Sequence, residues 1–269
     1  NQKKSNVSWG NNIKTFPKIF YPEKNLDVLK IFKNKNSFVI QGNRRSYGDV
    51  CLNNKNVLST RKMDKIIHFD HKKGIVKIEA GVLLKDLLEL IIPHGWFIPT
   101  TPGTKYVTIG GMIANNIHGK NTKKNCIKHY IKKIKLLKIN KKIITCSPIK
   151  NKKIFDLTVG GFGLTGLIIS AEIKLKKISS EIINQKIVEF KNYSEFYSIY
   201  EKNNYHEYAV SWIENFDKNK LKPNFNFENL SLMEEEHLLT KASIPYRDQD
   251  LNSSKDDIIR RRLDEQLFS

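Results

Sequence analysis

The stretch QGNRRSYGDVCLN, residues 41–53, stands out from the sequence around it. The chain is rich in lysine, isoleucine and asparagine and poor in arginine, yet Arg44 and Arg45 lie side by side here. Gly42 and Gly48 bracket the pair, and glycine is favoured where a backbone must turn sharply or come close to another group. This composition indicates a loop with a specific function.

The chain has 269 residues, enough for one large domain or two ordinary ones, and a formal net charge of +20. A strongly basic chain can bind nucleic acid by displacing counterions from phosphates. Here, however, lysine is spread over nearly every segment instead of gathering with aromatic residues on one patch. Abundant Lys, Asn and Ile are typical of an AT-rich genome. We therefore expect no nucleic-acid partner; an anionic membrane surface or a phosphorylated substrate is the alternative explanation of the charge.

The cysteines and the apolar runs indicate the cellular compartment of the protein. Cys51, Cys126 and Cys146 are an odd number without metal-ligand spacing, so neither a disulfide framework nor a metal site is expected. No apolar run approaches the length of a membrane span, and the first residues contain no signal-peptide core. These features favour a reducing, cytoplasmic location.

Strand and helix patterns alternate along the first two thirds of the chain, which indicates an α/β or α+β fold. Alternating apolar residues predict strands at Val57–Ser59, Ile66–His68, Gly74–Gly81 and Leu167–Ile178, and a hairpin over Ile131–Cys146 that turns at Asn140. Leu83, Leu84, Leu87, Leu88 and Ile91 form one helical stripe, which Pro93 and Gly95 end.

The pattern changes towards the end of the sequence. After a predicted helix at Asn192–Lys202, the stretch YAVSWIENFD, residues 208–217, reads as the first strand of a new domain. The basic chain becomes acidic near residue 231. Its last segment gives no series of strands of the kind that a domain interior requires.

The stretch GGFGLTG, residues 160–166, has the glycine spacing of a dinucleotide fingerprint. A Rossmann fingerprint must open a helix, but these glycines lead into LIISAEIKL, which is β-branched and alternating. The glycines are better explained by a tight turn between two elements, packed against something bulky.

A stronger glycine signal is TPGTKYVTIGGMIANNIHGKN, residues 101–121. Pro102-Gly103-Thr104 predicts a turn, and Gly110-Gly111 removes side chains where another surface must come close. Backbone amides that no side chain covers can bind a pyrophosphate. Alternatively, these glycines only allow the turns and close packing of the backbone. The presence of a second glycine-rich loop at residues 41–53 argues against this alternative.

The chain resembles the vanillyl-alcohol-oxidase (PCMH-type) flavoproteins, which have similar motifs in the same order and at similar separations. The motifs here are GNRRSYGD, TPGTKYVTIGGMIANNIHGKN and TVGGFGLTGLI. More narrowly, the chain resembles the decaprenylphosphoryl-ribose oxidase branch of that family, and its opening VSWGNN is similar to the same branch. The resemblance implies an α+β fold with two subdomains and FAD between them. It implies an FAD-binding domain at residues 7–178, and a linker with the start of an incomplete or divergent substrate domain at 179–269.

The resemblance also implies which residues contact the cofactor. The first loop would wrap the pyrophosphate and pass near the ring, the second stretch would line the cofactor and run beside the isoalloxazine, and one backbone position would meet the adenine. Carried over motif by motif, the contacts are Ile40, Gln41, Gly42, Asn43, Arg44, Arg45, Ser46, Tyr47, Gly48, Asp49, Val50, Gly103, Thr108, Ile109, Gly110, Gly111, Asn115, Asn116, Ile117, His118 and Ile168.

Three further matches imply catalytic residues. Tyr47, His118 and Lys120 occupy positions that face the substrate pocket in the resembling branch. Each has a plainer reading: a core aromatic residue for Tyr47, a hydrogen-bonded structural histidine for His118, and a solvated lysine for Lys120.

The sequence departs from the family pattern at several places. Arg44 replaces a glycine of the first motif, and Thr122 and Cys126 stand where the branch has other residues. Arg45 occupies the position at which many relatives carry a histidine bonded to the flavin, so we expect non-covalent FAD. The sequence given ends at Ser269, soon after the substrate domain should begin. We therefore expect weak or no turnover by this form, unless a partner polypeptide completes the domain.

The activity implied is oxidation of a secondary alcohol of a sugar, by hydride transfer to flavin N5. A small-molecule or lipid-linked sugar, such as a polyprenyl-phosphate pentose used as a cell-wall precursor, would be the substrate of a bacterial enzyme in the cytoplasm or at the membrane surface. An aldonolactone-oxidase-like enzyme and a non-catalytic flavin-binding fragment are the alternatives.

Overall fold

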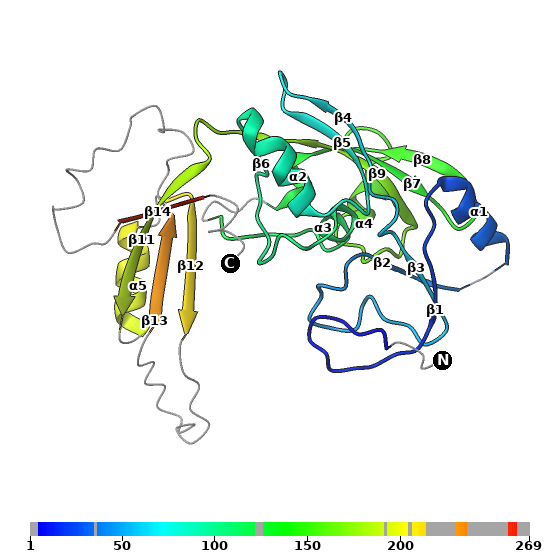
Figure 1. The fold of residues 1–269 in the computed structure, drawn as a ribbon, viewed down its shortest axis with the longest axis horizontal. Coiled ribbons are helices and arrows are strands. Elements are labelled where there is room, and N and C mark those ends of the chain that lie inside the picture. The colour runs from blue at the N-terminus through cyan, green and yellow to red at the C-terminus, as the bar shows by residue number, and fades with distance from the viewer. Residues whose placement is uncertain are drawn as a thin grey trace. The chain divides into compact units, whose positions relative to one another are not determined.

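The computed structural model of the chain describes residues 5–34, 37–121, 126–190, 193–203, 206–213, 230–235 and 258–262. The chain is divided into two compact units (Figure 1). The first comprises residues 1–118 and 125–176, and the second comprises residues 119–124 and 177–269.

The first unit begins with a small parallel sheet. Its strands β1 (Lys18–Phe20), β3 (Asn56–Ser59) and β2 (Val39–Gln41) lie in that order, so β3 is central. Helix α1 (Asn25–Asn34) connects β1 to β2 and buries Val28 and Phe32, which are four residues apart and share one helical face. They pack with Leu58 of β3 in one core cluster. The strand predicted at Val57–Ser59 is confirmed.

The second sheet of this unit has five strands and is antiparallel throughout. The order is β4 (Ile66–Asp70), β5 (Ile75–Glu79), β9 (Leu167–Lys174), β7 (Ile131–Leu137) and β8 (Ile143–Cys146). β9 lies at the centre, and its first five residues are all buried. The predicted strands and the hairpin are confirmed, and the hairpin closes where the Lys138 N–H donates to the Lys142 carbonyl.

Short helices complete the first unit (Figure 1). They are α2 (Leu84–Ile91), η1 (Ile92–His94), α3 (Ile109–Ala114), η2 (Ile127–Tyr130) and α4 (Lys152–Thr158), with strand β6 (Trp96–Phe97) after η1. The predicted apolar stripe forms the buried face of α2, and Gly95 ends this region in a left-handed conformation. Among the described residues, no helix has the length and apolar character needed to cross a bilayer.

The described residues of the second unit form a four-stranded antiparallel sheet and one helix. The strands are β11 (Ile182–Phe190), β12 (Tyr208–Ile213), β13 (Leu230–Glu235) and β14 (Ile258–Arg262), in the order β12-β13-β11-β14, and the helix is α5 (Tyr193–Asn203). Strand β10 (Lys176–Lys177) lies at the boundary between the units. The expectation that the last segment lacks strands is wrong, because β13 and β14 both pair with β11. The α+β class is confirmed.

Candidate functional site

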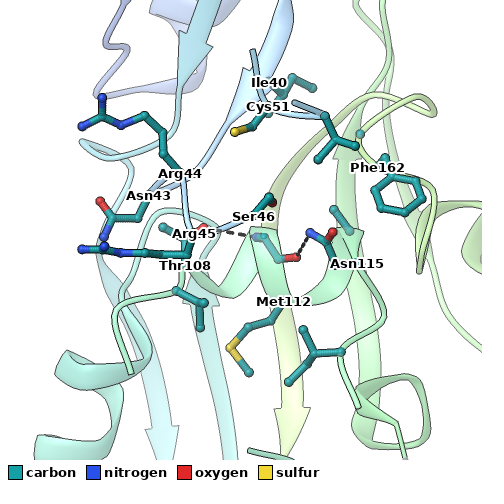
Figure 2. Close-up of a pocket in the computed structure, with 18 of the residues that line it drawn as sticks. Ile40, Asn43, Arg44, Arg45, Ser46, Cys51, Thr108, Met112, Asn115 and Phe162 are labelled. Carbon is teal, nitrogen blue, oxygen red and sulfur yellow. Dashed lines mark hydrogen bonds between the residues drawn. The ribbon is translucent and has the colours of Figure 1, made fainter. Parts of the chain in front are cut away.

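The first unit contains a cavity of about 570 Å³, whose lining includes Ile40 of the parallel sheet and Ile168 of the antiparallel sheet. This volume is in the range typical of small-molecule and cofactor sites. Three stretches build most of the wall: the loop that follows β2, the segment around α3, and the glycine turn that leads into β9. Figure 2 shows Asn43, Arg44 and Arg45 on one side of the view and Phe162 on the other.

The loop after β2 offers backbone donors to this cavity. The Gln41 side chain fixes its two ends together, because Nε2 donates to the Cys51 carbonyl at 2.7 Å. Within the part of the chain that the structure describes, no backbone N–H from Asn43 to Val50 donates to another protein group. Asn43, Arg45 and Ser46 are half-buried, where N–H groups normally find an acceptor, and the rest of the run is exposed. A run of unused donors therefore fits an anionic ligand.

The backbone conformation of Arg44 explains why the resembling family has a glycine at this position. Its φ is +57°, in the left-handed region that favours glycine, so the arginine holds a strained conformation. Its Nη1 lies 3.5 Å from Oδ1 of Asn6, at the limit of a hydrogen bond.

Arg45 lies between two aromatic rings. Its guanidinium carbon is 5.0 Å from the ring centre of Trp9 and 5.6 Å from that of Tyr106, which are cation–π distances. Its Nε is buried, and no described residue accepts a hydrogen bond from it. This positive charge lines the cavity with an unused donor.

The stretch around α3 does not supply the free amides that its glycines predicted. The N–H groups of Ile109 and Gly110 donate to the carbonyls of Val82 and Ala80 at 2.9 and 2.8 Å. The N–H of Gly111 donates to Thr108 Oγ1 at 3.2 Å, as the dashed line in Figure 2 shows. These three amides therefore donate within the fold and are not free donors, and their predicted contact with the cofactor stays a prediction.

Close packing explains one of these glycines instead. A Cβ on Gly110 would lie 2.8 Å from the Ala80 Cβ. Gly48 and Gly103, in contrast, have no atom within 4 Å of an added Cβ. Both line the cavity, so side chains there would fill space that a ligand can use.

The third stretch is a turn that opens a strand. Phe162 and Gly163 have φ values of +50° and +82°, and the chain then enters β9. A Cβ on Gly166 would lie 2.6 Å from the Leu137 carbonyl oxygen, so the backbone approach requires glycine. The exclusion of a Rossmann fingerprint is confirmed.

Most of the residues predicted to contact a cofactor line this cavity. They are Ile40, Gly42, Asn43, Arg44, Arg45, Ser46, Tyr47, Gly48, Val50, Gly103, Thr108, Gly110, Gly111, Asn115, Ile117 and Ile168. The predicted residues outside the wall are Gln41, Asp49, Ile109, Asn116 and His118. The wall also contains residues that the sequence did not assign to the site: Trp9, Cys51, Thr60, Ala80, Pro102, Thr104, Val107, Met112, Ala114, Phe162, Gly163 and Gly166. Several of these belong to the quoted glycine motifs, and that membership could have identified them from the sequence.

The three catalytic candidates lie in different surroundings. Tyr47 is 77% exposed and lines the cavity, so the reading of this side chain as a core aromatic is wrong. His118 is exposed and outside the wall. Lys120 belongs to the second unit, where its carbonyl accepts from the Ala209 N–H at 2.9 Å.

One thiol belongs to the wall. Cys51 is 8% exposed, and burial raises the pKa of its thiol above the usual value. The side chain therefore acts as a protonated, apolar part of the wall at neutral pH rather than as a nucleophile.

Residues 18–147 match the profile of a family described as FAD binding domain. The chain is similar to the decaprenylphosphoryl-beta-D-ribose oxidase of Mycolicibacterium smegmatis, with 35% identity over 140 residues, which is 51% of this chain and 30% of that protein. It is 28% identical to a D-lactate dehydrogenase of Anaerostipes hadrus, over 51% of this chain and 30% of that protein. It is 23% identical to the L-gulonolactone oxidase of Mus musculus, over 62% of this chain and 39% of that protein. The matched stretches thus span about a third of these relatives.

Proposed function

This chain is a flavoprotein of the vanillyl-alcohol-oxidase (PCMH-type) superfamily, whose members are FAD-dependent oxidoreductases, and we propose that it oxidises a secondary alcohol of a sugar. The observation that carries the proposal is the cavity in the FAD binding domain. Its wall brings together backbone amides without a protein acceptor, an arginine, and glycines beside which there is free space.

The residues of the cavity fit FAD. In the proposal, the amides from Asn43 to Val50 donate to the pyrophosphate. No described protein group accepts a hydrogen bond from these amides. The Arg45 guanidinium adds a positive charge beside them. The open faces of Gly48 and Gly103 leave room for the cofactor. In the proposal, the FAD is held without a covalent bond.

The chemistry is divided between cofactor and chain. FAD, when bound, would supply the acceptor for the hydride of the carbinol carbon. The chain must then orient the sugar and accept the hydroxyl proton. Tyr47 is in the wall and exposed, so its hydroxyl can orient a substrate at the cavity mouth. His118 is the candidate base, and Lys120 is a candidate for binding the substrate.

Similarity supports the substrate class. The relative with 35% identity is named for a phosphorylated ribose, and a phosphorylated, lipid-linked pentose would suit a chain of net charge +20. Such a substrate would bring the protein to a membrane surface from the cytoplasm. An aldonolactone-oxidase-like activity is the second candidate, since the similarity to L-gulonolactone oxidase extends over 172 residues.

Reduction of bound flavin without oxygen tests the proposal. The FAD-loaded chain is mixed anaerobically with a polyprenyl-phosphate pentose, an aldonolactone or D-lactate, and the visible flavin absorption is followed. We expect slow bleaching with the pentose, in keeping with the weak turnover expected of this form, and none with D-lactate. Bleaching with the aldonolactone alone would support the second candidate, and FAD binding without bleaching by any of the three would contradict both and indicate a non-catalytic flavin-binding chain.

A further inference from the structure

We propose that the segment Asn6–Thr15, which precedes the residues matched by the family profile, is a positioning element of the FAD site. Its role is to hold the loop Asn43–Val50 in the shape in which the unused amides face the cavity, with Trp9 as part of the wall.

Hydrogen bonds join the two ends of the segment to each other. Asn6 and Thr15 exchange two backbone hydrogen bonds at 2.8 and 3.0 Å, and the Thr15 hydroxyl also donates to the Asn6 carbonyl at 2.9 Å. Asn6, Ser8 and Thr15 are all nearly inaccessible to solvent. Buried and hydrogen-bonded polar groups make a short segment rigid, so it can support another segment.

Backbone contacts then join the segment to the loop. The N–H of Trp9 donates to the carbonyl of Ser46 at 3.0 Å. A Cβ on Gly10 would overlap the carbonyl oxygen of Tyr47, so the two backbones approach more closely than any other residue would allow. The Ser46 carbonyl is thereby occupied by a backbone donor of this segment, while the neighbouring amides stay unused.

Side chains reinforce the same junction. The Arg45 guanidinium is held between Trp9, from this segment, and Tyr106, from the second glycine stretch. Asn43 Nδ2 donates to the Tyr106 carbonyl at 2.7 Å, so the loop is held from two sides. Arg44 keeps its left-handed backbone while its side chain reaches Asn6. A strained residue of this kind persists only where its surroundings fix it.

Equilibrium titration with FAD, followed by flavin fluorescence, measures the effect of this support. We expect Trp9→Ala to weaken FAD binding about tenfold, and Trp9→Phe to restore it to within about twofold, because an aromatic face still covers the guanidinium. Ile13→Ala is the matched control: Ile13 is on the same segment, 46% exposed and outside the wall, and its loss should leave binding unchanged.

Two further measurements separate positioning from general stability. Since Trp9 acts through Arg45, the double variant Trp9→Ala/Arg45→Met should bind FAD about as weakly as Arg45→Met alone. The near-ultraviolet and visible circular dichroism of FAD at saturation should also differ between Trp9→Ala and the parent chain. The melting temperatures of the unliganded variants show whether each is folded.

Gly10→Ala provides a second, independent test, because it disturbs only the backbone junction. We expect weaker FAD binding by this variant than by Ile13→Ala. Parent-like affinity and dichroism in both folded Trp9→Ala and Gly10→Ala would overturn the proposal. So would fully additive losses in the double variant. These results would leave the sugar oxidation itself untouched, because that proposal is tested by flavin reduction.

Discussion

Gly42 and Thr108, from the two glycine-rich motifs, are in such close contact that a Cβ on the glycine would overlap the threonine Oγ1. That oxygen is already the acceptor for the Gly111 N–H and caps α3. The glycine of the first motif is therefore required by the side chain that organises the second. The two motifs form one structural unit across 66 positions of sequence, between residues 42 and 108.

This contact predicts the effect of Gly42→Ala. The new methyl group should displace the Thr108 side chain from Gly111, lower the free energy of unfolding by about 1–3 kcal/mol and weaken FAD binding. Thr108→Ala alone should cost about 1 kcal/mol through the lost cap. The double variant should be more stable than the sum of the single effects, because the overlapping oxygen is gone. Strict additivity in urea unfolding would contradict the assignment.

A carboxylate at Gly111 should expel the cofactor. Gly111 lines the cavity, so Gly111→Asp places a negative charge near the cofactor's own anionic group, and FAD should bind about a hundredfold more weakly or worse. Gly111→Asn has nearly the same volume without the charge. Fluorescence titration of both variants separates the two causes, and equal losses would mean that volume alone is responsible.

FAD should dissociate from the denatured protein. Arg45 occupies the position at which many relatives carry the histidine that bonds to the flavin, and a guanidinium stays protonated at working pH and has no lone pair for attack. Acid precipitation should leave yellow colour in the supernatant and no fluorescent band on a denaturing gel. A fluorescent band would show a covalent link.

The three free cysteines should react with an alkylating reagent in a defined order. Burial raises the pKa of Cys146 to about 11 and also raises the pKa of Cys51, so at pH 8 little of either thiol is the reactive thiolate. Cys126 is partly exposed and should be modified first. Mass spectrometry of peptides after brief iodoacetamide treatment measures this order.

FAD should slow the alkylation of Cys51 further, because this thiol lines the cavity. Cys146 is also buried, at 0% exposure against 8% for Cys51, but lies outside the wall, so it serves as the internal control. Protection of both thiols would indicate a general stabilisation, and protection of neither would place the cofactor elsewhere.

Local patterns predicted much of the antiparallel sheet and α2, since alternation and helical stripes report which face a segment buries. The parallel sheet was only partly foreseen. β1 and β2 have three residues each, too few for a period to appear, and they are fixed by pairing with β3. β13 and β14 escaped prediction for a related reason, because their pairing partner β11 is distant in sequence.

The candidate site shows the same limit. The motifs correctly indicated the loop and the glycine turns, because glycine spacing is local. They did not indicate that the amides of Ile109 and Gly110 donate to the carbonyls of Val82 and Ala80, more than twenty residues away in sequence. Trp9 was noted only within a resembling motif, and its place in the wall depends on Arg45.

Amide hydrogen exchange with and without FAD tests the central claim, that the loop Asn43–Val50 holds the cofactor's pyrophosphate with its unused donors. Peptides that cover this loop should exchange rapidly in the unliganded chain and slowly at saturating FAD. Peptides that cover Ile109–Gly111 should be slow in both, since their amides are already bonded. Riboflavin, which lacks the pyrophosphate, should not slow the loop. Unchanged exchange of Asn43–Val50 in a chain whose fluorescence shows bound FAD would contradict the account.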